Sequence, residues 1–428
     1  MKHERCWVAL AEALGPRSPL LRPLLERFGS PENIFAADES ALREAVPDIG
    51  RGTLANLLEK RSDAEAERIT SWCYRDGVRI LTYDSAAYPA SLRNIDEPPA
   101  VLYCRGQLPA QEGRLMLGVV GTRKPDAYGE RVTYKLAFEM AAAGAVIVSG
   151  MAEGLDAIAA AGALNAGGET IAVLGCGIDI VYPKYHTRLA AEIAQHGAIL
   201  TEFAPGTPPN GWNFPMRNRL ISALSGGVLV VEASERSGAL ITARYAVVQG
   251  KPLFAVPGDI GLSRSAGTNA LLANGAQPAL GTHELLTHFR FLYRDAVRLQ
   301  ALPEAEQYSD LTPQVLRPFG LRMRGEGAVL TVTEKNEEKP RKKLRLRRKK
   351  VKTVQENASV PAETAAPPDT SLLTPRQKEL YAMLPAVPFT VDVLTAQGVP
   401  VAEAVSCLTV FEIYGLLASR PGGTFEKK

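Results

Sequence analysis

Short apolar runs alternate with longer stretches of helical spacing between about Leu115 and Ala276. A helical stretch follows each of the first five runs, and a shorter one, Asn269–Ala273, follows the sixth. Runs this apolar are typical of strands buried on both faces, which occur in parallel sheets covered by helices on each side. The pattern therefore predicts a doubly wound, mostly parallel α/β sheet. Its six expected strands are Met116–Val120, Ala145–Val148, Thr170–Leu174, Ala198–Thr201, Gly227–Val231 and Pro252–Val256.

Six glycines stand where the helices of this region are expected to stop. A glycine just beyond a helix adopts the left-handed conformation at little cost and commonly marks the C-terminal end. Each period of the pattern therefore carries its own stop signal, which supports the alternation independently of the apolar runs. These glycines are Gly144, Gly167, Gly197, Gly226, Gly250 and Gly275.

The first 75 residues have the spacing of short helices broken by Gly and Pro. Three helices are expected there, at Leu21–Phe28, Glu39–Ala45 and Thr53–Lys60. The stretch Val46–Gly50 resembles the turn of a helix-hairpin-helix, whose backbone N–H groups could meet a phosphate. A small structural helical cap is the favoured interpretation, and the phosphate-binding turn is the alternative.

Regular patterning is lost after about residue 290 and returns at Leu373. The intervening sequence contains Lys339–Lys352, with ten Lys or Arg and no acid, and then Ala-, Pro-, Glu- and Thr-rich sequence. This composition is typical of a flexible linker. Three helices and a two-stranded wing at Ser419–Phe425 are expected beyond it, which predicts a winged-helix module. The three helices are Pro375–Leu384, Thr390–Gln397 and Val401–Leu417.

The chain, at 428 residues, is too long for one ordinary domain. The patterns above divide it into four parts. These are a helical domain at residues 1–75, the α/β domain with its lead-in segment at 76–290, the basic flexible linker at 291–370 and the winged-helix domain at 371–428.

Composition indicates in which cellular compartment the protein is expected. The longest uncharged apolar runs, such as Leu220–Val231, are too short to span a bilayer, and Met1–Arg5 lacks the apolar segment of a signal peptide. The five cysteines are scattered and form no C-x-x-C pair, which argues against a zinc site or a disulfide framework. A cytoplasmic protein that does not associate with membranes is expected.

The net charge is +3, yet the basic run alone carries +10, so the rest of the chain is near −7. An anion-binding site in the folded part must therefore be a local cluster of cations.

The expected strand ends carry such a cluster. In open parallel sheets, ligands bind beyond the carboxyl ends of the strands, and here those positions are dominated by Gly and Ser. Small residues let a phosphate approach the backbone and meet free N–H groups of the following helix. Arg123 and Lys184 lie on the same edge, and Arg217 and Arg219 begin the helix after the fourth strand. Several phosphates of one nucleic-acid strand need several such cations in a row. The edge therefore predicts a site for a phosphate-bearing ligand.

Two other interpretations of this edge stay open. The arginines of the fourth helix could pair with Glu202 or Glu232 and serve only structure. The acids near the edge could also form a catalytic pair, which would make the protein an enzyme that acts on a nucleotide. Of these two roles for the acids, the favoured one is that they hold the arginines in place. The acids concerned are Glu153, Asp156, Asp179, Glu202 and Glu232.

Standard cofactor and catalytic motifs are not found. Gly175–Ile180 lacks the third glycine of a dinucleotide fingerprint, and no G-x-x-x-x-G-K-[ST] loop occurs. The five histidines show no H-E-x-x-H spacing, and there is no G-x-S-x-G elbow. We therefore expect no cofactor, no metal and no catalytic residues.

Seven motifs follow one another across about Leu117 to Ala276. They are Gly121–Arg123, Ser149–Asp156, Gly175–Asp179 with Tyr182–Pro183, Phe214–Arg219, Val231–Ala233, Ser237–Ala243 and Phe254–Gly258. As an ordered set they resemble the DprA (Smf) family of bacterial DNA-processing proteins. The flanking regions are similar as well, with a helical domain like a sterile alpha motif (SAM-like) before the core and a winged-helix domain after it.

The resemblance implies a Rossmann-like protein that binds single-stranded DNA and loads the recombinase RecA onto incoming strands in natural transformation. It also implies protection of the strand from nucleases, relief of single-strand-binding protein, homodimers formed through the Rossmann-like domain, and no established catalytic activity. Position by position, Arg123 and Lys184 match the family's DNA-contacting cations. One departure is His186, where the family more often has Asn, so the resemblance carries no DNA contact over to this position. The expected DNA-binding residues are Gly121, Thr122, Arg123, Ser149, Gly150, Lys184, Arg217, Asn218, Arg219, Ser237 and Gly238.

Overall fold

The computed structural model divides the chain into two compact units, Met1–Glu334 and Lys335–Lys428, which are described separately. In the first unit it describes residues 2–59, 63–293, 297–299 and 311–323. In the second it describes residues 375–385, 387–390, 392–397, 399, 404, 407–408, 410–411, 416–420 and 424–427. The basic run Lys339–Lys352 lies outside the described residues.

A nine-stranded sheet forms the centre of the first unit, in the order β1-β2-β6-β5-β4-β3-β7-β8-β9. The six strands from β3 to β8 lie next to one another and are all parallel, so the doubly wound α/β prediction is confirmed. Each lies within a residue or two of its expected position, because every apolar run is bounded by a turn. Their bounds are β3 Met116–Val120, β4 Val146–Ser149, β5 Thr170–Val173, β6 Gly197–Thr201, β7 Gly227–Val230 and β8 Leu253–Ala255.

Three strands were not expected. β1 (Arg79–Thr82) and β2 (Val101–Gly106) form an antiparallel pair, and β2 continues antiparallel along β6. β9 (Gln277–Pro278) adds two residues to the other edge. β1, with four residues and one exposed arginine, and β9, with two residues and a proline, give too short a pattern to distinguish a strand from a loop.

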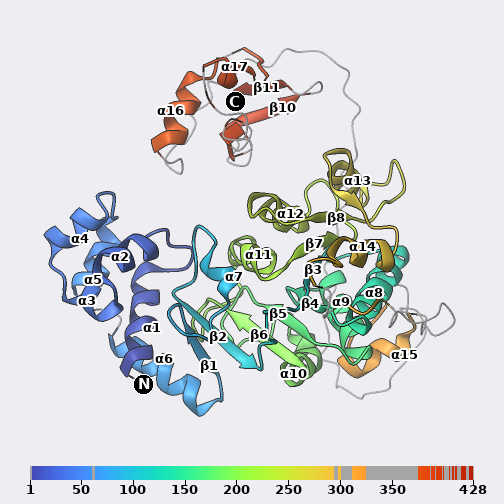
Figure 1. Ribbon diagram of the computed structural model, residues 1–428, viewed down its shortest axis with the longest axis horizontal. Helices are drawn as coiled ribbons and strands as arrows, with labels where there is room; N and C mark the ends of the chain where they lie inside the picture. The colour runs from blue at the N-terminus through green and yellow to red at the C-terminus, as the bar shows by residue number, and fades with distance from the viewer. Residues whose placement is uncertain are drawn as a thin grey trace, which may run out of the picture. The chain divides into compact units, whose positions relative to one another are not determined.

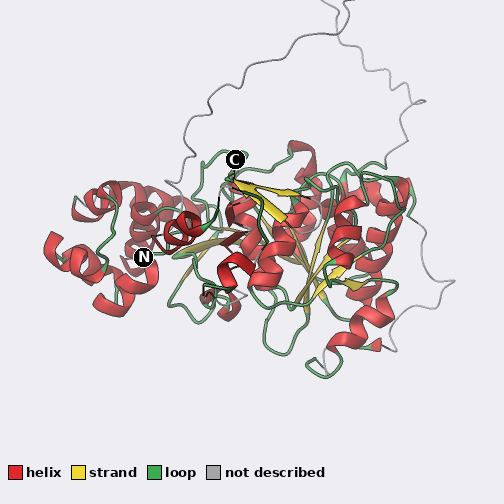
Figure 2. Cartoon of the chain, turned by 90° about the horizontal axis from the view of Figure 1, so that it is seen from above, coloured by secondary structure: helices red, strands yellow, loops and turns green. Residues whose placement is uncertain are grey.

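Helices cover both faces of the sheet and divide the apolar residues into two cores (Figures 1 and 2). Side chains alternate along a strand, so Leu117 and Val119 face one core while Met116 and Val120 face the other. The first core holds α8 (Ala127–Ala142), α9 (Leu155–Asn165), α10 (Thr187–Gln195) and α14 (Thr282–Phe289). The second holds α7 (Ala90–Arg93), α11 (Asn213–Leu224) and α12 (Ala239–Val248), while α13 (Ala266–Ala273) packs beside β8.

Glycines end four of the expected helices in the way the sequence predicts. Gly144, Gly167, Gly250 and Gly275 have φ between 64° and 96°. Gly197 serves a different purpose, because a Cβ there would overlap the carbonyl oxygen of Thr170 on the neighbouring strand.

In residues 2–59 and 63–75, six helices form the N-terminal part of the first unit. The bounds of α2 (Leu21–Phe28) and α4 (Glu39–Ala45) agree with the prediction, and α5 (Arg51–Leu58) begins two residues earlier than expected. Three further helices were not assigned individually, namely α1 (Lys2–Leu14), α3 (Pro31–Ala36) and α6 (Asp63–Arg75). Their buried side chains, with Trp7 the largest, belong to the same core as α8 to α10.

Part of the segment assigned to the linker is packed against the core. α15 (Pro313–Leu316) and the short 3₁₀ helix η4 (Arg317–Phe319) lie against α9 and α10. Leu316 and Phe319 are buried, and the side-chain amide of Asn165 donates to the Val315 carbonyl at 3.0 Å. The linker prediction did not anticipate this, because one short turn between prolines carries no helical periodicity.

The second unit has its own small core around Leu380, Leu408 and Phe411. α16 (Pro375–Met383) and α17 (Asp392–Thr395) lie within the first two expected helices. β10 (Leu417–Arg420) and β11 (Thr424–Lys427) pair antiparallel where the wing was expected. In the described parts of both units, no helix combines the length and apolar character that crossing a membrane requires.

Candidate nucleic-acid interface

A cavity of about 400 Å³ opens at the carboxyl ends of β3 and β7. These two strands are neighbours in the sheet, and the chain leaves them in opposite directions, toward β4 and toward β8. This reversal is the position where open α/β sheets bind their ligands. We call it the strand-end cavity. Seven of the expected DNA-binding residues line it: Gly121, Thr122, Arg123, Arg217, Asn218, Ser237 and Gly238.

The loop after β3 is held by its backbone. The Thr122 N–H donates to the Glu232 carbonyl at 2.8 Å, and the Thr122 carbonyl accepts from Leu155 at 3.2 Å. A side chain at Gly121 would overlap Leu155, and one at Gly154, where φ is +82°, would meet the backbone of Arg123 at 2.8 Å. The loop is therefore fixed between β7 and α9 and presents the Arg123 side chain outward.

Arg123 is, with Lys124, one of the two exposed cations in the lining of this cavity. Its Cζ lies 5.1 Å from the ring centroid of Phe214, which also lines the cavity. Within the described residues, Arg123 forms no ion pair with a carboxylate. A guanidinium that rests on an aromatic face and has no acidic partner is free to meet a phosphate. The sequence analysis quoted Phe214 only as part of a motif and gave it no role.

Arg217 lines the same cavity but its guanidinium is already bound. The side chain is buried, donates to the carbonyls of Gly150 (2.9 Å) and Val173, and donates to Asn218 Oδ1 at 3.2 Å. Burial lowers the pKa of Arg217 to about 10, with the nearby Asp156 carboxylate acting in the opposite direction, so the group is still charged at neutral pH. Arg217 therefore shapes the floor of the cavity.

Ser149 and Gly150 are buried beneath this floor rather than in the lining. The Ser149 hydroxyl donates to the Val119 carbonyl at 2.7 Å, and the Gly150 N–H donates to Asp156 at 3.1 Å. A Cβ on Gly150 would lie 2.5 Å from Arg217 Nη2. The turn is small because Arg217 and Asp156 pack directly against it.

Arg219 does not reach the strand-end cavity. Its Nη2 donates to Glu202 Oε2 at 2.6 Å, and the two side chains are only 3% and 2% exposed. Residues two apart on a helix point to different sides, so Arg217 and Arg219 of α11 cannot face the same surface. The expectation of a DNA contact from Arg219 is therefore corrected in favour of the alternative, a structural pair with Glu202.

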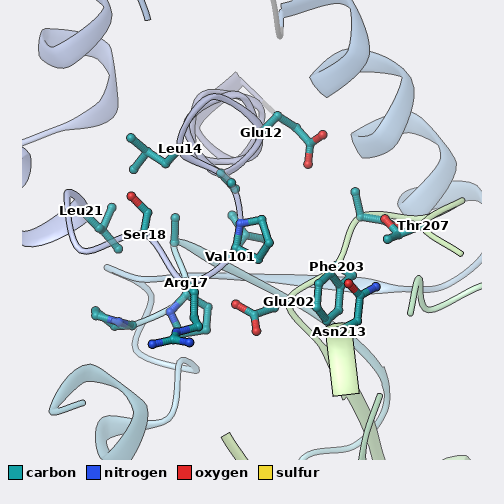
Figure 3. Close-up of a pocket in the computed structure, with 17 residues that line it drawn as sticks. Glu12, Leu14, Arg17, Ser18, Leu21, Val101, Glu202, Phe203, Thr207 and Asn213 are labelled. Carbon is teal, nitrogen blue, oxygen red and sulfur yellow. The ribbon is translucent and has the colours of Figure 1, made fainter. Parts of the chain in front are cut away.

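Glu202 belongs to a different pocket, of about 240 Å³, between the α1–α2 turn and the α/β core. Figure 3 shows its carboxylate among the lining residues, which include Arg17 and Asn213. This places the Glu202–Arg219 pair at the junction of the helical region and the sheet.

Lys184 is exposed but does not line the strand-end cavity. It begins the 3₁₀ helix η1 (Lys184–His186), just after Tyr182, whose ring centroid lies 5.5 Å from that of Phe214. A DNA contact from Lys184 stays a prediction. His186 is buried, its Nδ1 donates to the Met151 carbonyl at 3.0 Å, and burial lowers its pKa.

Glu232 differs from the expectation that arginines hold the edge acids. Its Oε2 accepts from the Asp126 N–H at 3.2 Å, and the side chain lies against Gly129 rather than in the lining of the strand-end cavity. Burial raises the pKa of Glu232 to about 6. Asp179 likewise binds backbone, accepting from the Gly206 N–H at 2.8 Å.

The raised pKa of Glu232 predicts a pH dependence of stability. The folded protein holds this proton more tightly than the unfolded chain, so the contribution is present below the ordinary carboxyl pKa and is lost as pH rises through about 6. Glu232→Gln keeps an acceptor for Asp126 without the charge. We expect its melting temperature, measured relative to that of the native chain, to rise between about pH 5 and pH 8. Glu153→Gln, on an exposed side chain, is the control, and an equal trend in both variants would contradict the assignment.

Comparisons with known proteins agree with this geometry. The model of the family DNA recombination-mediator protein A matches residues 79–290. Protein Smf from Synechocystis sp. is 32% identical over 426 residues, which cover 99% of this chain and 98% of that protein. The X-ray structure of DNA processing protein A (DprA) from Streptococcus pneumoniae is 30% identical, covers 65% of this chain and 95% of its own, and has a TM-score of 0.57.

A structure of DNA processing protein A from Helicobacter pylori, described for the single-stranded DNA binding mode of that protein, is 36% identical. It covers 50% of this chain and 97% of its own, with a TM-score of 0.46. Because the Synechocystis relative matches nearly end to end and the family model covers the α/β core, this chain belongs to the DNA recombination-mediator protein A family, whose members are named DprA or Smf.

Proposed function

We propose that this chain binds single-stranded DNA at the strand-end cavity and acts as a recombination mediator. The observation that carries the proposal is Arg123, an exposed arginine without a carboxylate partner in the described chain, beside small-residue loops at the reversal point of the sheet. Backbone N–H groups and an arginine fork suit phosphate oxygens. Following its family, the protein would load RecA onto incoming strands in natural transformation, protect them, and relieve single-strand-binding protein, in the cytoplasm.

Single strands are favoured over duplex because aromatic faces lie around the cavity. Phe214 lines it, Tyr182 packs against Phe214, and Trp212, just before α11, is 71% exposed. Unpaired bases can stack on the exposed rings of Tyr182 and Trp212, whereas the bases of a duplex are already stacked on one another. Stacking is tolerant of sequence, so little sequence preference is expected.

The proposal is tested by a binding titration that compares a single-stranded oligonucleotide, the matching duplex and a mononucleotide at two salt concentrations. We expect the single strand to bind best and to lose affinity in added salt, because phosphate contacts release counterions. Tighter binding of duplex by the chain would contradict the proposal, and so would equal binding of the mononucleotide.

We also propose a homodimer formed through the α/β domain. Large apolar side chains are exposed on elements near the β8–β9 edge of the sheet: Val247, Val248, Ile260, Leu262 and Leu280. Exposed apolar side chains in one region are typical of an association surface. Light scattering of the purified chain measures its mass directly, and a monomer at all concentrations would contradict this part of the proposal.

The alternative, an enzyme that cleaves nucleotides, finds its strongest support in Glu232, whose raised pKa suits a proton donor. Glu232, however, does not line the strand-end cavity, and Asp156, which does, accepts from the Gly150 N–H. We therefore expect no hydrolysis of nucleoside monophosphates, ATP or DNA, with or without magnesium. Sustained turnover that is abolished by Glu232→Gln or Glu153→Gln would favour the enzyme.

A further inference from the structure

A second cavity, of about 550 Å³, adjoins the strand-end cavity. The two cavities share Arg123 and Lys124. One wall of the second cavity is formed by the starts of α8 and α9 and by the Tyr185–His186 turn. The opposite wall is Gly320–Met323, which follows η4 and belongs to the segment that the sequence assigns to the linker. A part of the chain far from the core motifs therefore completes a cavity next to the candidate DNA site.

This wall is held in place by buried neighbours. Leu316, Phe319 and Leu321 are buried in the core shared with α9 and α10. The Leu321 N–H donates to the Leu316 carbonyl at 3.2 Å, which closes the turn. A Cβ on Gly320 would lie 3.4 Å from the Tyr185 carbonyl oxygen, so the segment packs closely on the turn opposite. Arg322 directly follows the buried Leu321 and is itself exposed.

The charges that face the second cavity favour an anion. Arg123, Lys124 and Arg322 are exposed cations on its walls. Glu130 is buried on α8, and the exposed Glu153 accepts a hydrogen bond from the Tyr185 hydroxyl, so three exposed cations face one exposed acid. Within the described residues, Arg322 pairs with no carboxylate. An arginine fork in this state is suited to phosphate oxygens.

We propose that the second cavity is a further subsite for the same single strand, in which Arg322 contacts a phosphate of the strand that runs on past Arg123. The inference rests on the proposed function and extends it. Because Arg123 and Lys124 belong to both cavities, a phosphate chain held at this pair has a continuous path from one cavity into the other. A free anion or mononucleotide would fill one cavity only, whereas an extended strand uses both. A positively charged groove that follows the backbone is how single strands are bound without sequence preference.

The test compares Arg322→Glu with Arg317→Glu in the full chain. Arg317 is exposed on the same segment but lines neither cavity. Both variants replace an arginine by a glutamate, so they change the net charge equally. Binding is measured with oligothymidylates of about 4, 8 and 16 nucleotides. We expect Arg322→Glu to weaken binding of the longest oligonucleotide about tenfold, to leave the shortest nearly unaffected, and to lower the single-strand salt slope by about 0.7. Arg317→Glu is expected to retain native affinity for every length.

Equal behaviour of the two variants at every length would overturn the subsite. Loss of binding of the shortest oligonucleotide by Arg322→Glu would overturn the subsite as well. The effect of Arg322 would then not depend on a strand long enough to extend from Arg123 into the second cavity. Arg322→Gln, without charge reversal, decides the question if the Glu variant has a lowered melting temperature. Failure of the proposed function itself is distinguishable, because Arg123→Glu would then also bind every oligonucleotide as the native chain does.

Discussion

Replacing Arg123 by Glu is expected to weaken binding of single-stranded DNA about 100-fold while the melting temperature barely changes. The side chain is exposed and rests on the Phe214 ring, so its removal disturbs no buried contact. A hydrogen bond to a charged group contributes about 1.5–3 kcal/mol, which corresponds to roughly 10- to 150-fold in affinity, and the new carboxylate also repels the phosphates. Fluorescence anisotropy with a labelled oligonucleotide measures the loss.

Arg131→Glu is the matched control for this variant. Arg131 is exposed on α8, the helix that follows the Arg123 loop, and lines neither cavity. It carries the same change of charge, and we expect an effect of only a few-fold. Lys184→Glu is expected to fall between the two, because Lys184 is exposed near Tyr182 but lies outside the cavity lining. Native affinity in Arg123→Glu would mean that the arginine has no part in binding.

Replacing Arg219 by Met is expected to destabilise the fold by about 3–5 kcal/mol, the usual cost of leaving one member of a buried ion pair without its partner. Arg219 and Glu202 are almost fully buried against each other. The replacement leaves the Glu202 carboxylate without its ion-pair partner at the junction of the helical region and the sheet. Urea denaturation measures the loss. The effect on DNA binding of the fraction that stays folded is expected to be small.

The double variant Glu202→Leu with Arg219→Met supplies the control. Replacing both members of a buried pair by apolar residues is often neutral, so most of the lost stability should return. If Arg219→Met kept native stability and lost DNA binding, Arg219 would belong to the interface after all. Arg123→Glu is thus expected to lower the affinity for DNA and leave stability nearly unchanged. Arg219→Met is expected to lower stability and leave the affinity for DNA nearly unchanged.

Most of the α/β core follows from local patterns in the sequence. The strands from β3 to β8 could be placed because each apolar run is bounded by a turn, and four glycines end helices through their positive φ. The position of the strand-end cavity also followed, because the carboxyl ends of parallel strands meet at one edge. What could not follow is which side chains at that edge are exposed. Arg217 and Arg219 look alike in sequence, yet one lies under the cavity and the other in a separate buried pair.

Contacts between distant parts of the chain explain the rest. β2 is a strand because β6 offers an edge for pairing, and β1 pairs in turn with β2, which no local pattern reveals. Leu311–Met323 packs on α9 and α10 through a few apolar residues. The sequence pattern of this segment does not indicate which helices it contacts. The helical spacing of α11 indicates that residues two apart face different sides, and the sequence offered Glu202 as a possible partner. No local pattern decides which of the two arginines forms that pair.

Hydrogen–deuterium exchange of the full chain, with and without a saturating single-stranded oligonucleotide, tests directly where the strand lies. The account predicts that slower exchange on binding concentrates in the loops after β3 and β7, residues 121–125 and 234–239, and in the start of α11. Protection confined to other parts of the chain, with these loops exchanging as they do in the free protein, would contradict the assignment of the strand-end cavity as the DNA site.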